Sequence, residues 1–230
     1  ENISGLSEAG QINPADLNIF VVIPLKGLAF KMGSKTSLHY AIEAAKDSKY
    51  INKVIVATDN DESATLAESL GAECPFIRPP ELSEEWVNLE TVQQYNLEQL
   101  ESLDMYPDLI VHLEVTFPFR QKNLLDDMIK FTVIQGYDSV IACHRESGFL
   151  WQEQESGDFM RIDSGDIPRL LKEKLYVGLH GLACITRPEF VRRGSLMGEK
   201  IGLFKVDNPL SFLEIRDDDS RKIAEKFLSE

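Results

Sequence analysis

A continuous apolar run, IFVVIP at residues 19–24, decides the fold class of this chain. Such a run of β-branched residues, with no polar alternation, is typical of a strand buried on both faces of a parallel sheet. A second run, VIVATD at 54–59, follows a helical pattern at 37–48. The order of strand, helix and strand predicts right-handed crossovers and an α/β fold with a mostly parallel central sheet and helices on both faces.

The rest of the chain extends this pattern. We predict helices at 62–70, 89–103, about 123–134, 188–193 and 218–228, and strands at 108–115, 138–143, 180–185 and 200–206. The stretch 145–175 is polar and irregular, and a short hairpin is expected around 155–158. Residues 1–18 are interpreted as a polar leader and 19–230 as one domain, because this length suits a single large α/β unit.

Charge and cysteine content narrow the classes of partner. The net charge of −14 disfavours binding to nucleic acid or to anionic membranes, but permits a small anionic ligand where basic residues gather in one cleft. The three cysteines have no Cys-x-x-Cys spacing, which argues against a disulfide framework or a zinc site. The sequence contains no secretory signal pattern and no run of about 20 apolar residues. We therefore expect a cytoplasmic protein without a membrane partner.

The loop after the first strand is a candidate phosphate site. In open α/β sheets, ligands bind beyond the carboxyl ends of the strands. A glycine-bearing loop before a helix offers N–H groups to phosphates, and lysines add positive charge. The candidate residues in this loop are Leu25, Lys26, Gly27, Lys31 and Lys35. The loop is neither a Walker A sequence nor a dinucleotide fingerprint, and an ordinary solvated loop remains an equal alternative.

Polar residues also follow the later strands. Asp59 follows the second strand, where it would bind a nucleoside or, more commonly, cap the next helix. Glu114 ends the third strand and needs either an ion pair or a substrate contact. Near the C-terminus, Glu214 and Asp217 precede Asp218 and Asp219. Clustered carboxylates suit Mg²⁺, although the acidic first turn of a helix is the better explanation of the last two.

Several segments, in order, resemble the acylneuraminate cytidylyltransferase family, whose members act on sialic-acid-like and ulosonic acids. The resemblance covers about residues 19–225. Its strongest parts are SLHYAIEAAKDSKYINKVIVATDN at 37–60, IRPPEL at 77–82, LEVTFPFR at 113–120, DSVIAC at 138–143, YVGLHGLACITRPEF at 176–190 and EIRDDDSRKIAE at 214–225. It implies a three-layer, Rossmann-like nucleotidyltransferase fold.

The resemblance also implies a reaction, in which CTP and a 2-keto sugar acid give a CMP-sugar and pyrophosphate, with Mg²⁺ as the metal. Catalytic roles fall on Lys26 and Lys31, and nucleotide binding on Leu25, Gly27, Lys35, Asp59 and Arg78. Substrate contacts fall on Glu114, Thr116, Arg120, Tyr176 and His180, and metal binding on Glu214 and Asp217. About residues 145–200 resemble an arm through which family members form homodimers.

Two departures from the family pattern leave a second hypothesis open. The first loop is short and carries Lys26 where an arginine is usual, and Arg216 stands where a second metal carboxylate is usual. A non-catalytic nucleotide- or sugar-binding relative would tolerate both changes. A glycosyltransferase is the third hypothesis, and the absence of an Asp-x-Asp motif at residues 113–115 disfavours it.

Overall fold

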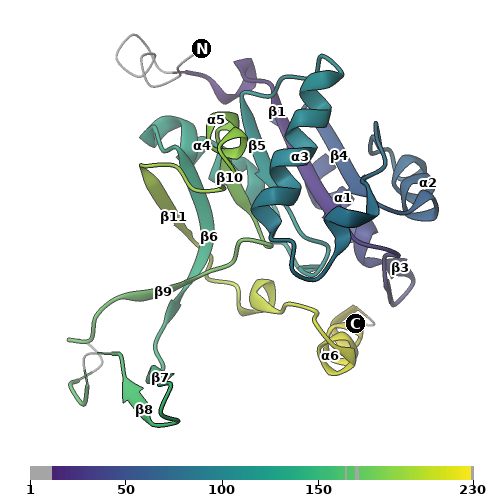
Figure 1. The fold of residues 1–230 in the computed structure, drawn as a ribbon. Helices are drawn as coiled ribbons and strands as arrows, with labels where there is room; N and C mark the ends of the chain where they lie inside the picture. The colour runs from purple at the N-terminus through teal and green to yellow at the C-terminus, as the bar shows by residue number, and fades with distance from the viewer. Residues whose placement is uncertain (1–11, 164, 169–170, 229–230) are drawn as a thin grey trace.

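The computed structural model describes residues 12–228, apart from residues 164 and 169–170. Its main sheet has the strand order β11, β6, β10, β5, β1, β4, and β9 pairs with the outer part of β6 (Figure 1). The strands of this sheet are β1 (Ile19–Leu25), β4 (Lys53–Thr58), β5 (Leu109–His112), β6 (Ser139–Glu146), β9 (Leu175–Gly178), β10 (Cys184–Thr186) and β11 (Ile201–Lys205).

The two apolar runs that predict the fold form neighbouring strands at one side of this sheet. β1 pairs in parallel with β4 and with β5. Its residues are almost fully buried, since both faces of the strand are covered. The carboxyl ends of β1, β4 and β5 therefore lie along one edge, as the strand–helix alternation predicts.

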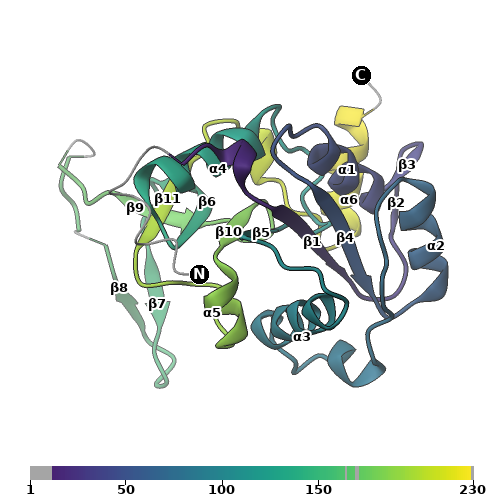
Figure 2. The same cartoon turned by 90° about the horizontal axis from the view of Figure 1, so that it is seen from above.

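Helices cover both faces of the sheet (Figure 2). α1 (Ser37–Lys46), α2 (Asp61–Ser69) and α4 (Leu124–Gln135) pack with the larger core cluster, whereas α3 (Leu89–Ser102) and α5 (Pro188–Arg192) pack on the opposite face. Each predicted helix is found within a few residues of its expected bounds, including α6 (Asp218–Leu228). The three-layer α/β prediction is confirmed.

Two strands have bounds that differ from the predicted ones. The strand expected at 108–115 stops at His112, because the Glu114 N–H leaves the parallel ladder and donates to the Gly181 carbonyl at 2.8 Å. The strand expected at 180–185 begins only at Cys184, because the preceding residues form a turn in which the Leu182 N–H donates to the Leu179 carbonyl. β10 is antiparallel to both of its neighbours, β5 and β6.

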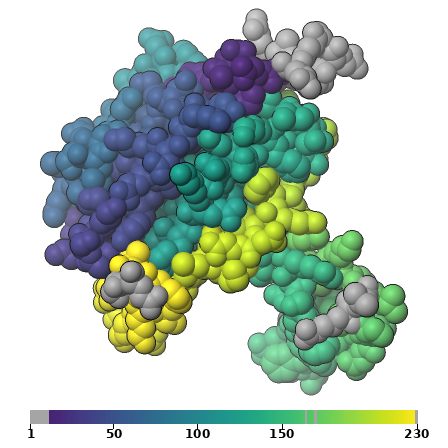
Figure 3. Space-filling model, turned by 180° about the vertical axis from the view of Figure 1, so that it is seen from behind, coloured from purple at the N-terminus to yellow at the C-terminus, as the bar shows by residue number. Residues whose placement is uncertain are grey.

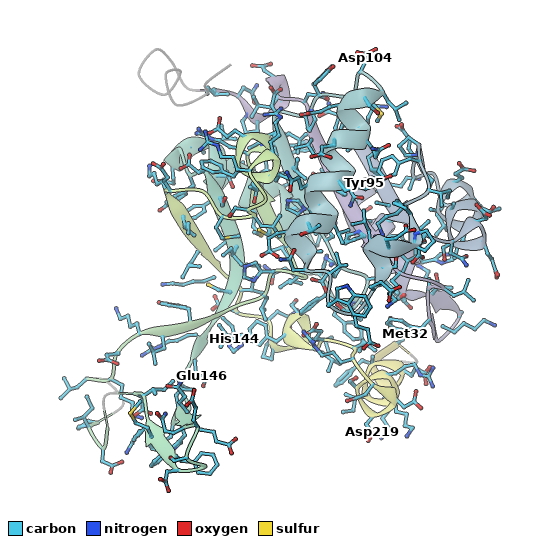
Figure 4. The ribbon with its side chains drawn as sticks, viewed as in Figure 1. Met32, Tyr95, Asp104, His144, Glu146 and Asp219 are labelled. Carbon is cyan, nitrogen blue, oxygen red and sulfur yellow. The ribbon has the colours of Figure 1, made fainter. Side chains whose placement is uncertain are left out.

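Residues 144–178 form an arm that stands away from the body of the molecule (Figures 1 and 3). β6 continues beyond the body and pairs antiparallel with β9 to make the stem of the arm, on which His144 and Glu146 lie (Figure 4). β7 (Trp151–Glu153) and β8 (Phe159–Arg161) form the hairpin expected around residues 155–158.

A short hairpin and three 3₁₀ turns complete the described structure. β2 (Lys31–Met32) and β3 (Lys35–Thr36) form a small hairpin, and Met32 packs against α6 (Figure 4). The 3₁₀ turns are Pro14–Asp16, Pro80–Ser83 and Pro209–Phe212. Most of the expected leader, residues 1–11, lies outside the described residues, whereas Leu17 packs on the core. Within the described ranges, no helix is long and apolar enough to cross a bilayer.

Candidate functional site

A pocket of about 470 Å³, here called the sheet-edge pocket, opens at the carboxyl end of β1. It brings together five residues predicted from the sequence, namely Leu25, Lys26, Arg78, Glu114 and Thr116. Its other walls are mainly apolar and come from the first loop and from the segment leading into α3, with Pro24, Leu28, Phe30, Leu82, Ser83, Glu84, Val87, Leu89, Val92 and Val115. The sequence prediction that ligand-binding residues meet at this edge agrees with this placement.

Asp59 contacts both Gly27, in the loop after β1, and Arg78, in the loop before α3. Its carboxylate accepts a 2.7 Å hydrogen bond from the Gly27 N–H and lies 3.8 Å from the Arg78 guanidinium. Although burial alone would raise the pKa of Asp59, hydrogen bonds from Ser83 and Gly27 and the Arg78 charge lower it. The cap expected from Asp59 is instead supplied by Asn60, whose side chain accepts from the Ser63 N–H. Capping was therefore the wrong structural role for Asp59.

Arg78 is 3% exposed and holds the ends of β1 and β4 together. It donates to the carbonyls of Ala57 at 3.2 Å and Leu25 at 3.4 Å, and to the Ser83 hydroxyl at 3.0 Å. Burial lowers its pKa, and the Asp59 carboxylate opposes that shift. The guanidinium therefore forms part of the pocket wall on the β4 side. The Gly27 N–H, which was predicted to approach the nucleotide, donates its hydrogen bond to Asp59.

The three lysines of the first loop differ in what surrounds them. Lys26 lines the pocket, and Gly27 beside it adopts a left-handed φ of 62°, which a residue with a side chain rarely tolerates. Lys31 and Lys35 lie on the β2–β3 hairpin, outside the pocket lining. Lys35 pairs with Glu43 at 2.6 Å. Within the described part of the chain, the ammonium groups of Lys26 and Lys31 have no hydrogen-bond or ion-pair partner.

Glu114 and Glu214 form a pair of neighbouring carboxylates at the β5 side of the pocket. Burial is the main reason that the pKa of Glu114 is raised, and the charge of Glu214 raises it further. The Thr116 hydroxyl lies 3.4 Å from Glu114, and Arg216 binds Glu214 at 2.8 Å. The Thr116 carbonyl accepts from the Ile215 N–H at 2.8 Å, and this bond brings the C-terminal segment to the pocket.

The raised pKa of Glu114 predicts a pH-dependent effect of Glu114→Gln. A carboxyl with a raised folded-state pKa contributes stability below its unfolded pKa, and this contribution is lost as the pH rises through the folded pKa. Relative to the unmodified chain, the variant should therefore gain in Tm between about pH 4 and pH 8. Calorimetry across this range measures the gain, with the exposed Glu153→Gln as control. A Tm difference that does not change with pH contradicts this expectation.

Arg120 does not line the sheet-edge pocket, and its guanidinium donates to backbone carbonyls. Its guanidinium makes bonds of 2.6–2.8 Å to the carbonyls of Glu114, Phe117, Gly181 and Leu182. Burial lowers its pKa to about 9. Four of its five N–H groups are thus committed to holding residues 114–120 against 181–182. Only the fifth N–H group of Arg120 is therefore available for the predicted substrate contact.

The acidic C-terminal cluster divides into two parts. Asp217 accepts from the N–H and the hydroxyl of Ser220, both at 2.7 Å, at the start of α6. Asp218 and Asp219 pair with Arg221 and Lys222 in the first turn of that helix. Among the described residues, no group of three or more metal-ligating side chains occurs. The neighbouring carboxylates of Glu114 and Glu214 are the donor set at the pocket that suits Mg²⁺ beside phosphates.

The remaining predicted residues lie toward the arm. Tyr176 is on β9, and the Lys205 ammonium lies 5.3 Å from its ring centre. His180 is exposed in the turn before β10, close enough to His112 for a repulsive charge interaction. Neither residue lines the sheet-edge pocket. Burial lowers the pKa of His112 to about 3, so this histidine is neutral in the core.

Sequence reasoning missed the apolar wall made by Leu28, Leu82 and Val87, together with Ser83. These residues carry no chemical signature, because ordinary loops contain the same types. The one usable signal was an isolated aromatic residue, Trp86, in the acidic stretch SEEWVNLE.

The family is decided by a comparison along the sequence. A family model described as cytidylyltransferase matches residues 23–148, which is more than half of the chain and includes the end of β1, the Arg78 segment and β5. The chain belongs to the cytidylyltransferase family. The matched region holds every residue that lines the sheet-edge pocket.

Curated relatives carry related names. The cytidylyltransferase is 29% identical over 184 residues to N-acylneuraminate cytidylyltransferase A of Danio rerio, covering 77% of this chain and 41% of the relative. It is 29% identical over 133 residues to pseudaminic acid cytidylyltransferase of Campylobacter jejuni, covering 58% of this chain and 53% of the relative. The chain thus spans about half, or less, of the length of these two relatives.

Solved structures share the fold of this cytidylyltransferase. A CMP:2-keto-3-deoxy-manno-octonic acid synthetase complexed with CTP superimposes with a TM-score of 0.67 at 13% identity, covering 92% of this chain and 98% of that chain. A 4-diphosphocytidyl-2C-methyl-D-erythritol synthase from Anaerococcus prevotii gives 0.66 at 15% identity, covering 93% and 99%. At these identities the likeness establishes the fold.

Proposed function

We propose that this chain transfers CMP from CTP to a 2-keto sugar acid of the sialic-acid or ulosonic-acid class and releases pyrophosphate. The observation that carries the proposal is the convergence of Lys26, Arg78, Glu114 and Thr116 on one pocket at the carboxyl ends of β1, β4 and β5. The membership of the chain in the cytidylyltransferase family supports CTP as the nucleotide. The names of the relatives support the acid.

The chemistry forms one bond to the α-phosphorus of CTP and breaks another. The anomeric hydroxyl oxygen of the sugar acid attacks the α-phosphorus, its proton passes to water, and the bond from the α-phosphorus to the bridging oxygen of the β-phosphate breaks, so that pyrophosphate leaves. Negative charge then builds on the phosphoryl oxygens and on the departing pyrophosphate. The unpaired ammonium of Lys26 is placed to stabilise this charge, and Arg78 and Asp59 fix the loop that carries it. Lys31 and Lys35 remain weaker proposals for the same role, since both lie outside the pocket lining.

The carboxylates of Glu114 and Glu214 would hold a Mg²⁺ ion. Their mutual repulsion, which raises the pKa of Glu114, would be relieved by a divalent cation. When bound, the ion would neutralise charge on the phosphates. Because Asp217 accepts hydrogen bonds at the start of α6, the proposal rests mainly on the two glutamates. Arg216 already binds Glu214, which favours the second hypothesis of a relative that binds ligands without turnover.

The test is pyrophosphate release from CTP with a panel of sialic, legionaminic, pseudaminic and deoxyoctulosonic acids. Each acid is assayed with Mg²⁺, with Mn²⁺ and with a chelator, and with ATP or GTP in place of CTP. We expect release with CTP, one acid and a divalent ion. Calorimetric binding of CTP without release from any acid would replace the enzyme with a binding protein. An absence of CTP binding would remove both functions.

We also propose that the chain forms a homodimer through the arm, in the cytoplasm, as its three free cysteines favour. Large apolar side chains are exposed on the arm, with 61% of Phe149, 57% of Trp151, 65% of Phe159 and 71% of Leu171 accessible. Clustered exposed side chains of this kind mark interaction surfaces.

Light scattering should therefore give twice the chain mass for the unmodified protein. Phe159→Asp should reduce this to one chain mass, because a buried, unpaired carboxylate opposes association. Ile134→Asp, at an equally exposed site on α4 of the body, is the control. An unmodified chain that stays monomeric at micromolar concentration would exclude this dimer.

A further inference from the structure

Trp86 is the most exposed large apolar side chain in the described structure, with 81% of its surface accessible. It lies between two residues that line the sheet-edge pocket, Glu84 and Val87. An indole exposes much apolar surface to water, and covering this surface is favourable. Its place beside a pocket, rather than on a remote loop, is what calls for an explanation.

The backbone that carries Trp86 is fixed at both ends. The Val87 N–H donates to the Glu84 carbonyl at 3.1 Å, so residues 84–87 form a turn with Trp86 at its tip. Directly after this turn, the Asn88 side chain caps α3 by accepting from the Thr91 N–H at 2.8 Å. The mobile part of this rim is therefore the Trp86 side chain, whose rotation about two torsions costs little while it makes few contacts.

On the other side of the turn, the rim is tied to the buried guanidinium. Ser83 accepts a 3.0 Å bond from Arg78, which itself holds the ends of β1 and β4. The turn that bears Trp86 thus keeps a set position relative to the first loop. An aromatic ring on such a rim is pre-positioned, and little ordering of backbone would accompany ligand binding.

The walls of the pocket favour a flat, weakly polar group at this end. Leu82 and Val87 belong to the same rim, and Leu28, which is 59% exposed, faces the pocket from the first loop. The Glu114 carboxylate belongs to the β5 side of the pocket and interacts with the charge of Glu214, and Lys26 is the cation of the first loop that lines the pocket. A nucleotide would therefore place its base by the apolar rim and its phosphates toward Lys26.

We infer that the Trp86 indole stacks on the pyrimidine base of CTP bound in the sheet-edge pocket and closes the pocket over the nucleoside. The inference rests on the proposed function for its nucleotide, and it assigns Trp86 as a nucleotide-binding residue. Base–aromatic stacking contributes on the order of 10-fold or more to affinity. It also gives the ring a new environment that is absent in the free protein.

The experiment uses the fact that the chain has two tryptophans, Trp86 and Trp151. In the Trp151→Phe variant the intrinsic fluorescence reports on Trp86 alone, and CTP should quench it. Trp86→Phe, which leaves Trp151, should show no response to CTP. By calorimetry, Trp86→Ala should bind CTP about 10-fold more weakly, whereas Trp86→Phe retains most of the affinity because a phenyl ring also stacks.

Inorganic tripolyphosphate, which has no base, separates stacking from a general change of the pocket. Its affinity should be the same for Trp86→Ala and the unmodified chain. If Trp86→Ala binds CTP as tightly as the unmodified chain does, or if Trp86 fluorescence ignores CTP, stacking is excluded while the proposed function stands. Equal weakening of CTP and tripolyphosphate also excludes stacking. If the unmodified chain binds no CTP, both the inference and the proposed function fail.

Discussion

Replacing Arg120 with methionine should lower the free energy of unfolding by about 3–5 kcal/mol, since several buried carbonyls lose charge-assisted hydrogen bonds at once. The guanidinium binds four carbonyls on two segments that are far apart in the sequence. Methionine fills much of the same volume but offers no donor to these carbonyls. Urea denaturation followed by circular dichroism measures the loss.

The matched control is Arg216→Met. Arg216 is 76% exposed and makes one ion pair, with Glu214, so its loss should change the free energy of unfolding by less than about 1 kcal/mol. Arg120→Lys should recover only part of the stability, because an ammonium cannot reproduce the planar fork that reaches both segments. Equal stability of Arg120→Met and Arg216→Met would show that the carbonyls find other partners.

Lys26→Ala should lower kcat/KM for pyrophosphate release by about 100-fold, while the fold is retained. Lys26 is the lysine that lines the sheet-edge pocket, and its ammonium has no partner within the described residues. A cation that meets charge as it develops contributes more to the transition state than to the ground state. CTP affinity should therefore fall less than kcat/KM falls.

Two other lysine variants serve as controls for Lys26→Ala. Lys35→Ala should have a smaller effect, because Glu43 already binds that ammonium, and Lys130→Ala on α4 should have none, because its partner is Asp127. Thermal unfolding of all three variants checks that folding is unchanged. If Lys26→Ala keeps its kcat/KM, the proposed reaction centre at the first loop is incorrect.

The body of the fold was predictable because its signals are local. β1 and β4 are uninterrupted apolar runs, and α3 begins at Leu89, as the sequence predicts. Such patterns fix the type of each element without knowledge of its neighbours. The end of β5 was not predictable, because it depends on a bond between Glu114 and Gly181, residues far apart in the chain. β10 begins later than predicted because the residues before it form the turn closed by the Leu182 N–H and the Leu179 carbonyl.

The position of the candidate site was predictable from the sequence, whereas the roles of its individual residues were not. Strand order brings Lys26 and Glu114 to one edge, as the carboxyl-end rule requires, whereas Arg78 was predicted there only through the family resemblance. A sequence does not reveal where the donors of a guanidinium point. Both Arg78 and Arg120 looked like ligand contacts, and the structure gives two N–H groups of Arg78 and four of Arg120 to backbone carbonyls.

The pairing of β6 with β9 has a consequence for protein engineering. His144 lies opposite Val177 in this antiparallel ladder, so the two ends of the intervening segment are adjacent. A two-residue turn can join antiparallel strands at such a point. We expect that the segment between these residues can be excised, shortened or exchanged for a hairpin from another protein. The strand order of the body would stay as it is.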